Sequence, residues 1–81
     1  MPYIREKDRG SVEQKGARLA GELNYLFTCE IIQFLRDRPL SYALINDVLG
    51  ALEGAKLEFV RRIVNPYEDK KIEENGDVYN V

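Results

Sequence analysis

The 81-residue sequence contains no histidine and only one cysteine, Cys29. Without imidazole it lacks the usual catalytic base near pH 7, and a single thiol argues against a protein zinc site. A lone cysteine cannot form an internal disulfide. No stretch approaches about 18 consecutive apolar residues, so we expect no membrane span. The first residues lack the apolar region of a signal peptide. These features together favour a cytoplasmic protein.

Neither sign of charge is in excess, because 12 basic and 14 acidic residues give a net charge of −2. This balance leaves no electrostatic footprint for nucleic acid. A glycine-rich phosphate loop is also missing. The carboxylates do not form the repeated acidic pairs of helical metal sites. We therefore expect no catalytic residue, no cofactor and no bound metal, and the composition favours a protein that is not an enzyme.

The length predicts one domain with a small core. Such a core contributes roughly 3–5 kcal/mol of net stability, and small chains usually add a disulfide, a metal or a partner. Because the first two are absent here, association of several copies is the remaining means of stabilisation. We predict a homo-oligomer, most simply a two-fold dimer.

The N-terminal part, residues 1–19, is predicted to form an extended arm over residues 1–9, whose Tyr3 and Ile4 pack on the body. Gly10 interrupts the arm, and Ser11 begins a short helical turn. Apolar residues at helical spacing then predict a helix over residues 20–37, which ends before Pro39. Its apolar arc contains the following residues: Leu19, Leu23, Leu26, Phe27, Ile31 and Phe34.

A second apolar pattern predicts a helix over residues 42–64, with Ser41 as its N-cap and Asn65-Pro66 as its end. The connection between the two main helices is about four residues, which predicts an antiparallel helical hairpin. The sequence therefore indicates an all-α protein made of a hairpin, an N-terminal arm and a C-terminal segment.

The C-terminal segment, residues 65–81, has two interpretations. In the first, Asn65 and Pro66 begin a short helix that Asn75-Gly76 closes. In the second, Asn75-Gly76 is a tight turn between two short strands. We favour the helix, because the strand pairing would place Glu74 opposite Asp77. We expect Tyr67 and Ile72 to pack on the hairpin or on a neighbouring chain.

One side of the second helix carries two glycines, and we call it the notched face. Glycine inside a helix costs about 1 kcal/mol relative to alanine, so two of them need a reason. That reason is the close approach of another helix, or a ligand that lies on the exposed backbone. The notched face contains the following residues: Asn46, Gly50, Glu53, Gly54, Leu57 and Arg61.

Basic side chains follow this face along the chain. Arg61 and Arg62, with Tyr67, Lys70 and Lys71 beyond them, are residue types that clamp a phosphate and stack a base. The alternative is ordinary pairing of both arginines with Glu58, three and four residues earlier.

Two more charged residues, Glu30 and Lys56, fall within the apolar arcs of their helices. They are offset by about two turns in the hairpin, so pairing across an oligomer is one interpretation. The other is that Lys56 extends its ammonium into solvent and Glu30 lies at the edge of the core.

Several segments are similar to known sequences: Met1–Ile4, Gly21–Tyr25, Ile45–Val48, Lys56–Phe59 with Arg61-Arg62, and the C-terminal motif PYEDKKIEENGDVY, residues 66–79. Together they resemble a family of small uncharacterised proteins of bacteria, archaea and their phages. The resemblance covers most of residues 20–79 and implies no particular activity.

We therefore interpret the chain as a small homo-oligomeric module that binds a protein or a small anionic ligand. A phage-type protein that sequesters a nucleotide signal is a specific version of this hypothesis. The alternatives are a structural or assembly protein and a metal-dependent phosphohydrolase.

Overall fold

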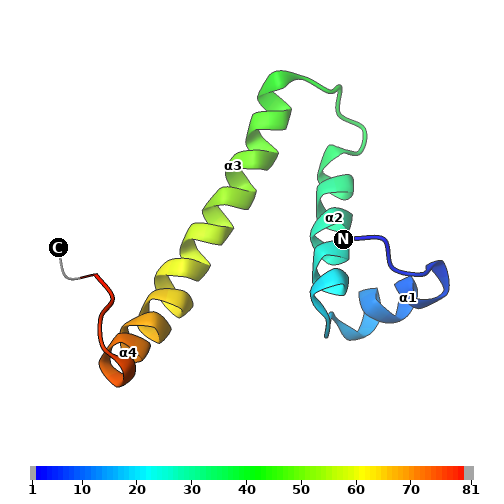
Figure 1. Ribbon diagram of the computed structural model, residues 1–81. Helices are drawn as coiled ribbons and strands as arrows, with labels where there is room; N and C mark the ends of the chain where they lie inside the picture. Colours follow the sequence, from blue (N-terminus) through cyan, green and yellow to red (C-terminus); the bar gives the residue numbers. More distant parts are fainter. Residues whose placement is uncertain (1, 80–81) are drawn as a thin grey trace. The chain divides into compact units, whose positions relative to one another are not determined.

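The computed structural model describes residues 2–79 and consists of helices joined by short non-helical segments (Figure 1). Over these residues there are four α-helices, one π-helical turn and no strand, which confirms the predicted all-α class. The chain divides into two compact units, Met1–Ser41 and Tyr42–Val81. The hairpin and the single domain stay predictions. The outermost positions of the predicted arm and C-terminal segment, 1 and 80–81, lie outside the described residues.

The first unit contains helix α1, Glu6–Lys15, so the predicted extended arm is wrong over residues 6–9, whereas residues 2–5 precede the helix and are not helical. Acidic side chains in the first turn and Lys15 in the last turn complement the helix dipole. Gly10 lies inside this helix and does not interrupt it. The buried side chain of Val12, which is 4% exposed, anchors the helix and offsets the small helical preference of Gly10.

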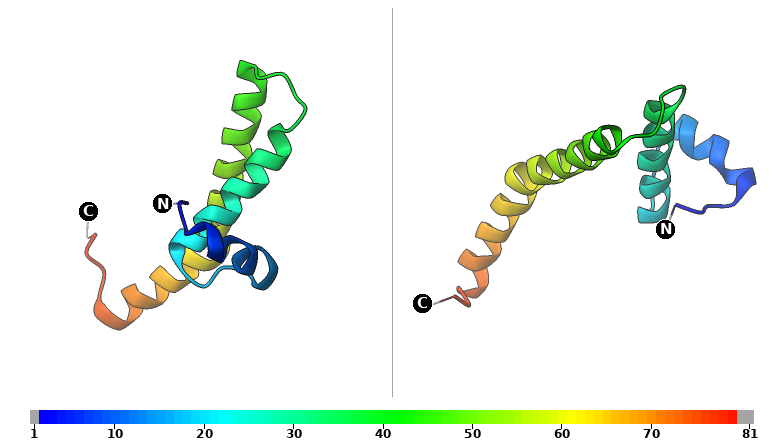
Figure 2. Two further views of the ribbon diagram at one scale, coloured as in Figure 1. Left: turned by 90° about the vertical axis from the view of Figure 1, so that its right-hand side faces the viewer. Right: turned by 90° about the horizontal axis from the view of Figure 1, so that it is seen from above.

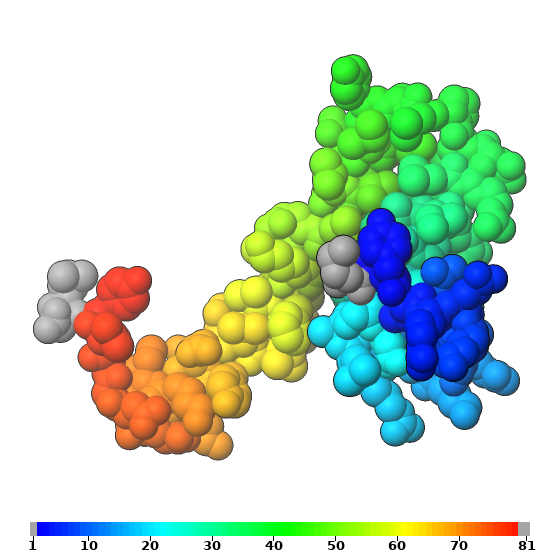
Figure 3. All heavy atoms as spheres, turned by 45° about the vertical axis from the view of Figure 1, so that its right-hand side comes forward, coloured from blue at the N-terminus to red at the C-terminus, as the bar shows by residue number. Residues whose placement is uncertain are grey.

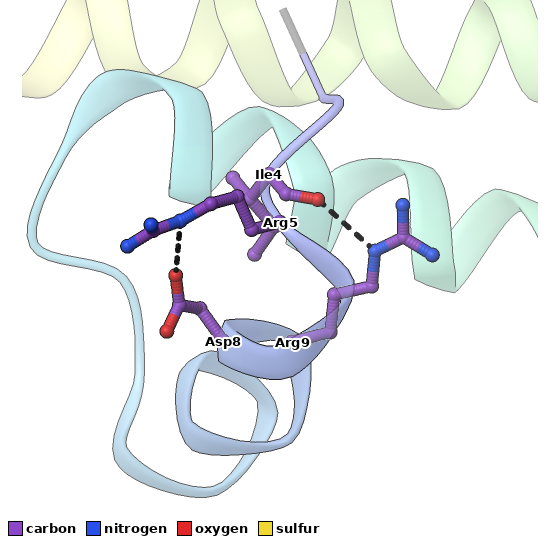
Figure 4. Close-up of polar contacts among 4 residues, drawn as sticks. All are labelled: Ile4, Arg5, Asp8 and Arg9. Carbon is purple, nitrogen blue, oxygen red and sulfur yellow. Dashed lines mark hydrogen bonds and ion pairs between the residues drawn. The ribbon is translucent and has the colours of Figure 1, made fainter.

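Two arginines fix the entry into α1 (Figure 4). Arg5 Nε lies 3.1 Å from Asp8 Oδ2, and Arg9 Nε donates a hydrogen bond of 3.2 Å to the carbonyl oxygen of Ile4. Tyr3 is 79% exposed, so the expectation that it packs on the body is wrong. Polar contacts, rather than apolar packing of Tyr3, therefore hold the start of the chain.

Helix α2, Ala20–Leu35, packs against α1. Glu22 caps its start, because its Oε1 accepts hydrogen bonds from the backbone N–H groups of Arg18 and Leu19 at 2.9 and 3.2 Å. The helix ends two residues earlier than predicted. Arg36 has extended backbone, and Asp37 adopts a positive φ of 63°. Aspartate tolerates this left-handed conformation better than most residues.

The second unit is built on a helix that continues from Tyr42 to Asn75 (Figure 2). It consists of α3, Tyr42–Phe59, the π-helical turn η1, Val60–Val64, and α4, Asn65–Asn75. The start at Tyr42 agrees with the sequence, but the predicted end at Asn65-Pro66 is wrong. Proline has no N–H group and its ring crowds the carbonyl four residues earlier. The π turn before Pro66 is wider than an α-helical turn, and this extra width accommodates the proline ring without ending the helix.

The structure supports the helical interpretation of the C-terminal segment. The N–H group of Gly76 donates to the carbonyl oxygen of Ile72 at 2.8 Å, and its positive φ of 89° ends α4. Because α4 continues α3, the side chains of Tyr67 and Ile72 stay exposed, at 58% and 43%. The expectation that they pack on the chain's own helices is therefore wrong. Their packing on a neighbouring chain stays a prediction.

The chain buries very little apolar surface. Among residues 2–79, Val12 and Leu44 are the buried hydrophobic side chains, and eighteen large ones are exposed. Four members of the apolar arc predicted for the first main helix are among the exposed ones: Leu19, Leu23, Phe27 and Phe34. The amphipathic patterns of the sequence are therefore real, but one copy of the chain leaves them largely uncovered.

Candidate functional site

The eight predicted site residues all lie in the second unit, on the continuous helix, and all are exposed. Figure 3 shows atoms of η1 and α4, in yellow and orange, on the face in view. Helix α3 carries Asn46, Gly50, Glu53 and Gly54, the π turn carries Arg61 and Arg62, and α4 carries Tyr67 and Lys70.

Glu58 holds both arginines of the π turn. Arg61 Nη1 lies 3.6 Å from Glu58 Oε1, and Arg62 Nε donates a hydrogen bond to the same oxygen. This is the pairing within one helix that the sequence offered as the alternative to a phosphate clamp. Such exposed pairs contribute only about 0.2–0.5 kcal/mol each. An anionic ligand would therefore compete with Glu58 for the guanidinium groups at small cost.

The tyrosine of α4 pairs with Lys71, one of the basic residues that the sequence analysis grouped with the two arginines. Lys71 Nζ lies 5.5 Å from the centre of the Tyr67 ring and 3.6 Å from Glu74 Oε1. A cation over the ring face is attracted by the ring quadrupole. Tyr67 is therefore already stacked against a cation of its own helix, which leaves its other face for a ligand.

The two glycines of the notched face border open space. A Cβ atom added at Gly50 or at Gly54 would meet no other atom within 4 Å. Within residues 2–79, nothing therefore approaches this side of the helix closely. Approach by a second copy, a partner or a ligand stays a prediction.

Lys56 pairs within its own helix. Its Nζ lies 3.7 Å from Glu53 Oε1, and its side chain is 68% exposed. Glu30, the other charged residue of the predicted apolar arcs, is exposed on α2. Both observations agree with the interpretation in which the Lys56 ammonium extends into solvent and Glu30 lies at the edge of the core.

A hollow of about 350 Å³ lies at the C-terminal end of α4, and the sequence gave no signal of it. The turn that forms one wall is held by the backbone N–H of Tyr79, which donates to Asp77 Oδ1 at 2.9 Å. Charged groups of both signs line the hollow, so it has no preference for one sign of ligand. Its lining residues include Glu68, Lys71, Ile72, Asp77 and Val78.

In the first unit, the Tyr25 hydroxyl is linked to two neighbours. Hydrogen bonding to the Cys29 side chain, with partial burial and the Glu13 carboxyl as smaller causes, raises the pKa of Tyr25 to about 12. Cys29 lies one helical turn after Tyr25 on α2, whereas Glu13 comes from α1. The spacing of four residues places Tyr25 and Cys29 on one side of α2, whereas no local pattern in the sequence indicates the contact with Glu13.

No group of three or more cysteine or acidic side chains within residues 2–79 is arranged to hold a metal ion. None of the helices over these residues combines the length and the apolar character needed to cross a membrane. The arrangement thus consists of exposed ion pairs, an open glycine notch and uncovered apolar side chains, all carried by helices.

Comparison with known proteins places the chain in a family of domains whose description assigns no function. A family model, Domain of unknown function (DUF6899), matches residues 1–78. The chain therefore belongs to the DUF6899 family. Neither the curated proteins nor the solved structures include a match to it.

Proposed function

We propose that this protein acts as a homo-oligomeric binding module, in which copies of the chain cover each other's apolar side chains. The observation that carries the proposal is the burial of only Val12 and Leu44 among the hydrophobic side chains of residues 2–79. Full burial of one large apolar side chain contributes about 1.5–3 kcal/mol. Association of copies would therefore stabilise the fold by burying apolar side chains that a single copy leaves exposed.

The binding surface in this proposal is the notched face together with the arginines of the π turn. Its open backbone at Gly50 and Gly54 accepts a flat group or another chain. Arg61 and Arg62 offer guanidinium groups whose partner, Glu58, is itself exposed and easily displaced. A small anionic ligand, with a nucleotide as its specific form, or an acidic protein segment fits this chemistry.

The alternative within the same class is a purely structural or assembly protein. It would use the same exposed apolar surface without any ligand. The cytoplasm remains the proposed location, supported by the single unpaired Cys29.

Two measurements test the proposal. Light scattering after gel filtration at micromolar concentration should give a multiple of the chain mass of 9.4 kDa. A mass of one chain would overturn the oligomer. A thermal-shift titration with nucleoside triphosphates should raise the melting midpoint with concentration.

The matched variants for that titration are Arg61→Gln with Arg62→Gln, and Arg36→Gln as the control in the first unit. The double variant should lose the shift, and the control should keep it. If no anion shifts the midpoint of the oligomer, the structural role replaces the ligand-binding one.

A further inference from the structure

The exposed apolar side chains of α3 follow the alternating three- and four-residue spacing of a coiled-coil seam. A single strict heptad repeat runs through the whole helix, interrupted only by one lysine. Every member is exposed, with exposed fractions from 38% to 87% among its apolar residues. We call this set the α3 seam, and it comprises Tyr42, Ile45, Leu49, Leu52, Lys56, Phe59 and Ile63.

The π turn keeps an apolar residue on this seam beyond Ile63. A heptad repeat continued without interruption would place Pro66 at the next seam position. A π-helical turn adds one residue to the helix, so the seam position falls on Tyr67 instead. Tyr67 is exposed as well. The seam thus extends from Tyr42 to Tyr67.

The seam is distinct from the side of α3 that one copy already buries. Leu44, which is 8% exposed, lies about 110° from the centre of the seam at 100° per residue. Gly54 lies about 170° from that centre, on the opposite side of the helix. A partner on the seam would therefore leave the two glycines of the notched face open.

The spacing of the seam is symmetric about Gly54. Leu52 and Lys56 lie two residues before and after it, and Leu49 and Phe59 lie five residues before and after it. Ile45 and Ile63 lie nine residues away on either side. Tyr42 and Tyr67 complete the series once the extra residue of the π turn is counted.

We propose that the α3 seam pairs with the same seam of a second copy of this chain, in an antiparallel coiled coil centred on Gly54. The inference rests on the proposed homo-oligomer and specifies its interface. Ile45 then lies opposite the partner's Ile63, and Leu49 opposite the partner's Phe59. If the chains were shifted by one heptad, Ile45 or Ile63 would no longer lie opposite an apolar seam residue of the partner. The register centred on Gly54 therefore pairs the largest number of apolar side chains.

The single charge on the seam selects this orientation. In a parallel dimer, Lys56 would face the partner's Lys56, and like charges at a seam position are repulsive. In the antiparallel register, Lys56 lies beside the partner's Glu53. Glu53 is at the edge of the seam on the side of Lys56, as their separation of 3.7 Å within one chain demonstrates. The centre of the dimer then holds two lysines and two glutamates.

A mixing experiment with full-length chains tests the charge pairing. Lys56→Glu places four acidic groups at the dimer centre, and Glu53→Lys places four basic ones. Each variant alone should dimerise at least about tenfold more weakly than the wild type. A mixture of the two variants restores opposite charges across the interface. With one variant ¹⁵N-labelled, native mass spectrometry should therefore find heterodimers well above the half of all dimers that random mixing gives.

Pairing within one chain does not produce this result, because each variant carries two like charges at 53 and 56. Circular dichroism of each variant checks that it stays helical. If the helical variants mix statistically, the pairing of Lys56 with the partner's Glu53 is wrong.

Spin-label distances test the orientation independently. Labels are placed at Glu73→Cys or at Asp47→Cys, each in a Cys29→Ser background. Because residues 73 and 47 lie 19 and 7 residues from Gly54, antiparallel chains should give about 57 and 21 Å along the axis. Parallel chains should give similar short distances, within about 20 Å, at both positions.

The outcomes separate this inference from the proposed function. A wild-type mass of one chain would overturn both. An oligomer with short distances at position 73 would overturn the antiparallel seam and leave the homo-oligomer intact.

Discussion

The backbone N–H group of Asn65 donates its hydrogen bond to the carbonyl oxygen of Val60, five residues earlier and immediately before Pro66 in the chain. An α-helix would use the carbonyl four residues earlier. This wider turn lets the helix pass through a proline without ending. The extra residue of this turn also rotates α4 relative to α3 by about 100°, which keeps Tyr67 aligned with the apolar side of α3.

Replacing the proline should remove the reason for the wide turn. In Pro66→Ala, we expect the N–H of Asn65 to bond to the carbonyl of Arg61 and α4 to rotate by about 100°. Hydrogen-bond couplings measured by NMR report directly which carbonyl accepts from Asn65. A coupling that still connects Asn65 with Val60 in the variant would assign the π turn to packing rather than to the proline.

The raised pKa of Tyr25, at about 12, predicts a late step in the titration of the tyrosines. The ordinary tyrosine pKa is about 10. The folded state therefore holds the Tyr25 proton at pH values where the unfolded chain releases it. The stabilisation is complete below pH 10 and is lost as the pH rises from about 10 to about 12.

The absorbance of tyrosinate against pH measures this step. Tyr25→Phe should remove the late component, and Tyr79→Phe should leave it in place. If the late component survives in Tyr25→Phe, another tyrosine is the perturbed one.

The sequence predicted the parts of the fold that depend on neighbouring residues. Pro39 lies in the connection between α2 and α3, Tyr42 begins α3, and Asn75-Gly76 closes α4, because each feature acts within about one helical turn. The pairing of Glu58 with both arginines was also visible from its spacing of three and four residues.

Other features depend on interactions that a local pattern does not contain. The continuation through Pro66 requires a π turn, which is rare and has no simple sequence signal. Helix α1 was missed because Gly10 has a low helical preference, while the packing that compensates for it comes from Val12. The contact of Tyr25 with Glu13 depends on how α1 lies on α2.

Two glycines at the start of the chain should respond in opposite directions to substitution by alanine. Gly10 is inside α1 and its added Cβ would meet open space, so Gly10→Ala should stabilise the first unit by about 0.5–1 kcal/mol. Gly16 has a φ of +91°, so Gly16→Ala should destabilise it by about 1 kcal/mol or more. Urea unfolding of both variants measures the difference. Stabilisation by both substitutions would contradict the positive φ at Gly16.

The glycines of the notched face give a test of what covers it. Within one chain, Gly50→Ala and Gly54→Ala put a methyl group into open space and improve the helical preference by about 1 kcal/mol each. We expect both variants to unfold at higher urea concentration with an unchanged oligomeric mass. A lower midpoint or a smaller mass would reveal a backbone from another copy lying against the notch.

Exposed apolar side chains on the α3 seam should contribute more to assembly than exposed apolar side chains elsewhere on α3. Phe59 and Leu57 are almost equally exposed in one chain, at 58% and 56%, but only Phe59 belongs to the heptad seam. Phe59→Ser should therefore shift the assembly towards single chains, because it removes a large apolar contact from each copy. Leu57→Ser is the matched control and should assemble as the wild type does. Sedimentation velocity over a concentration series measures both, and equal loss of mass in the two variants would show that assembly does not use one defined side of α3.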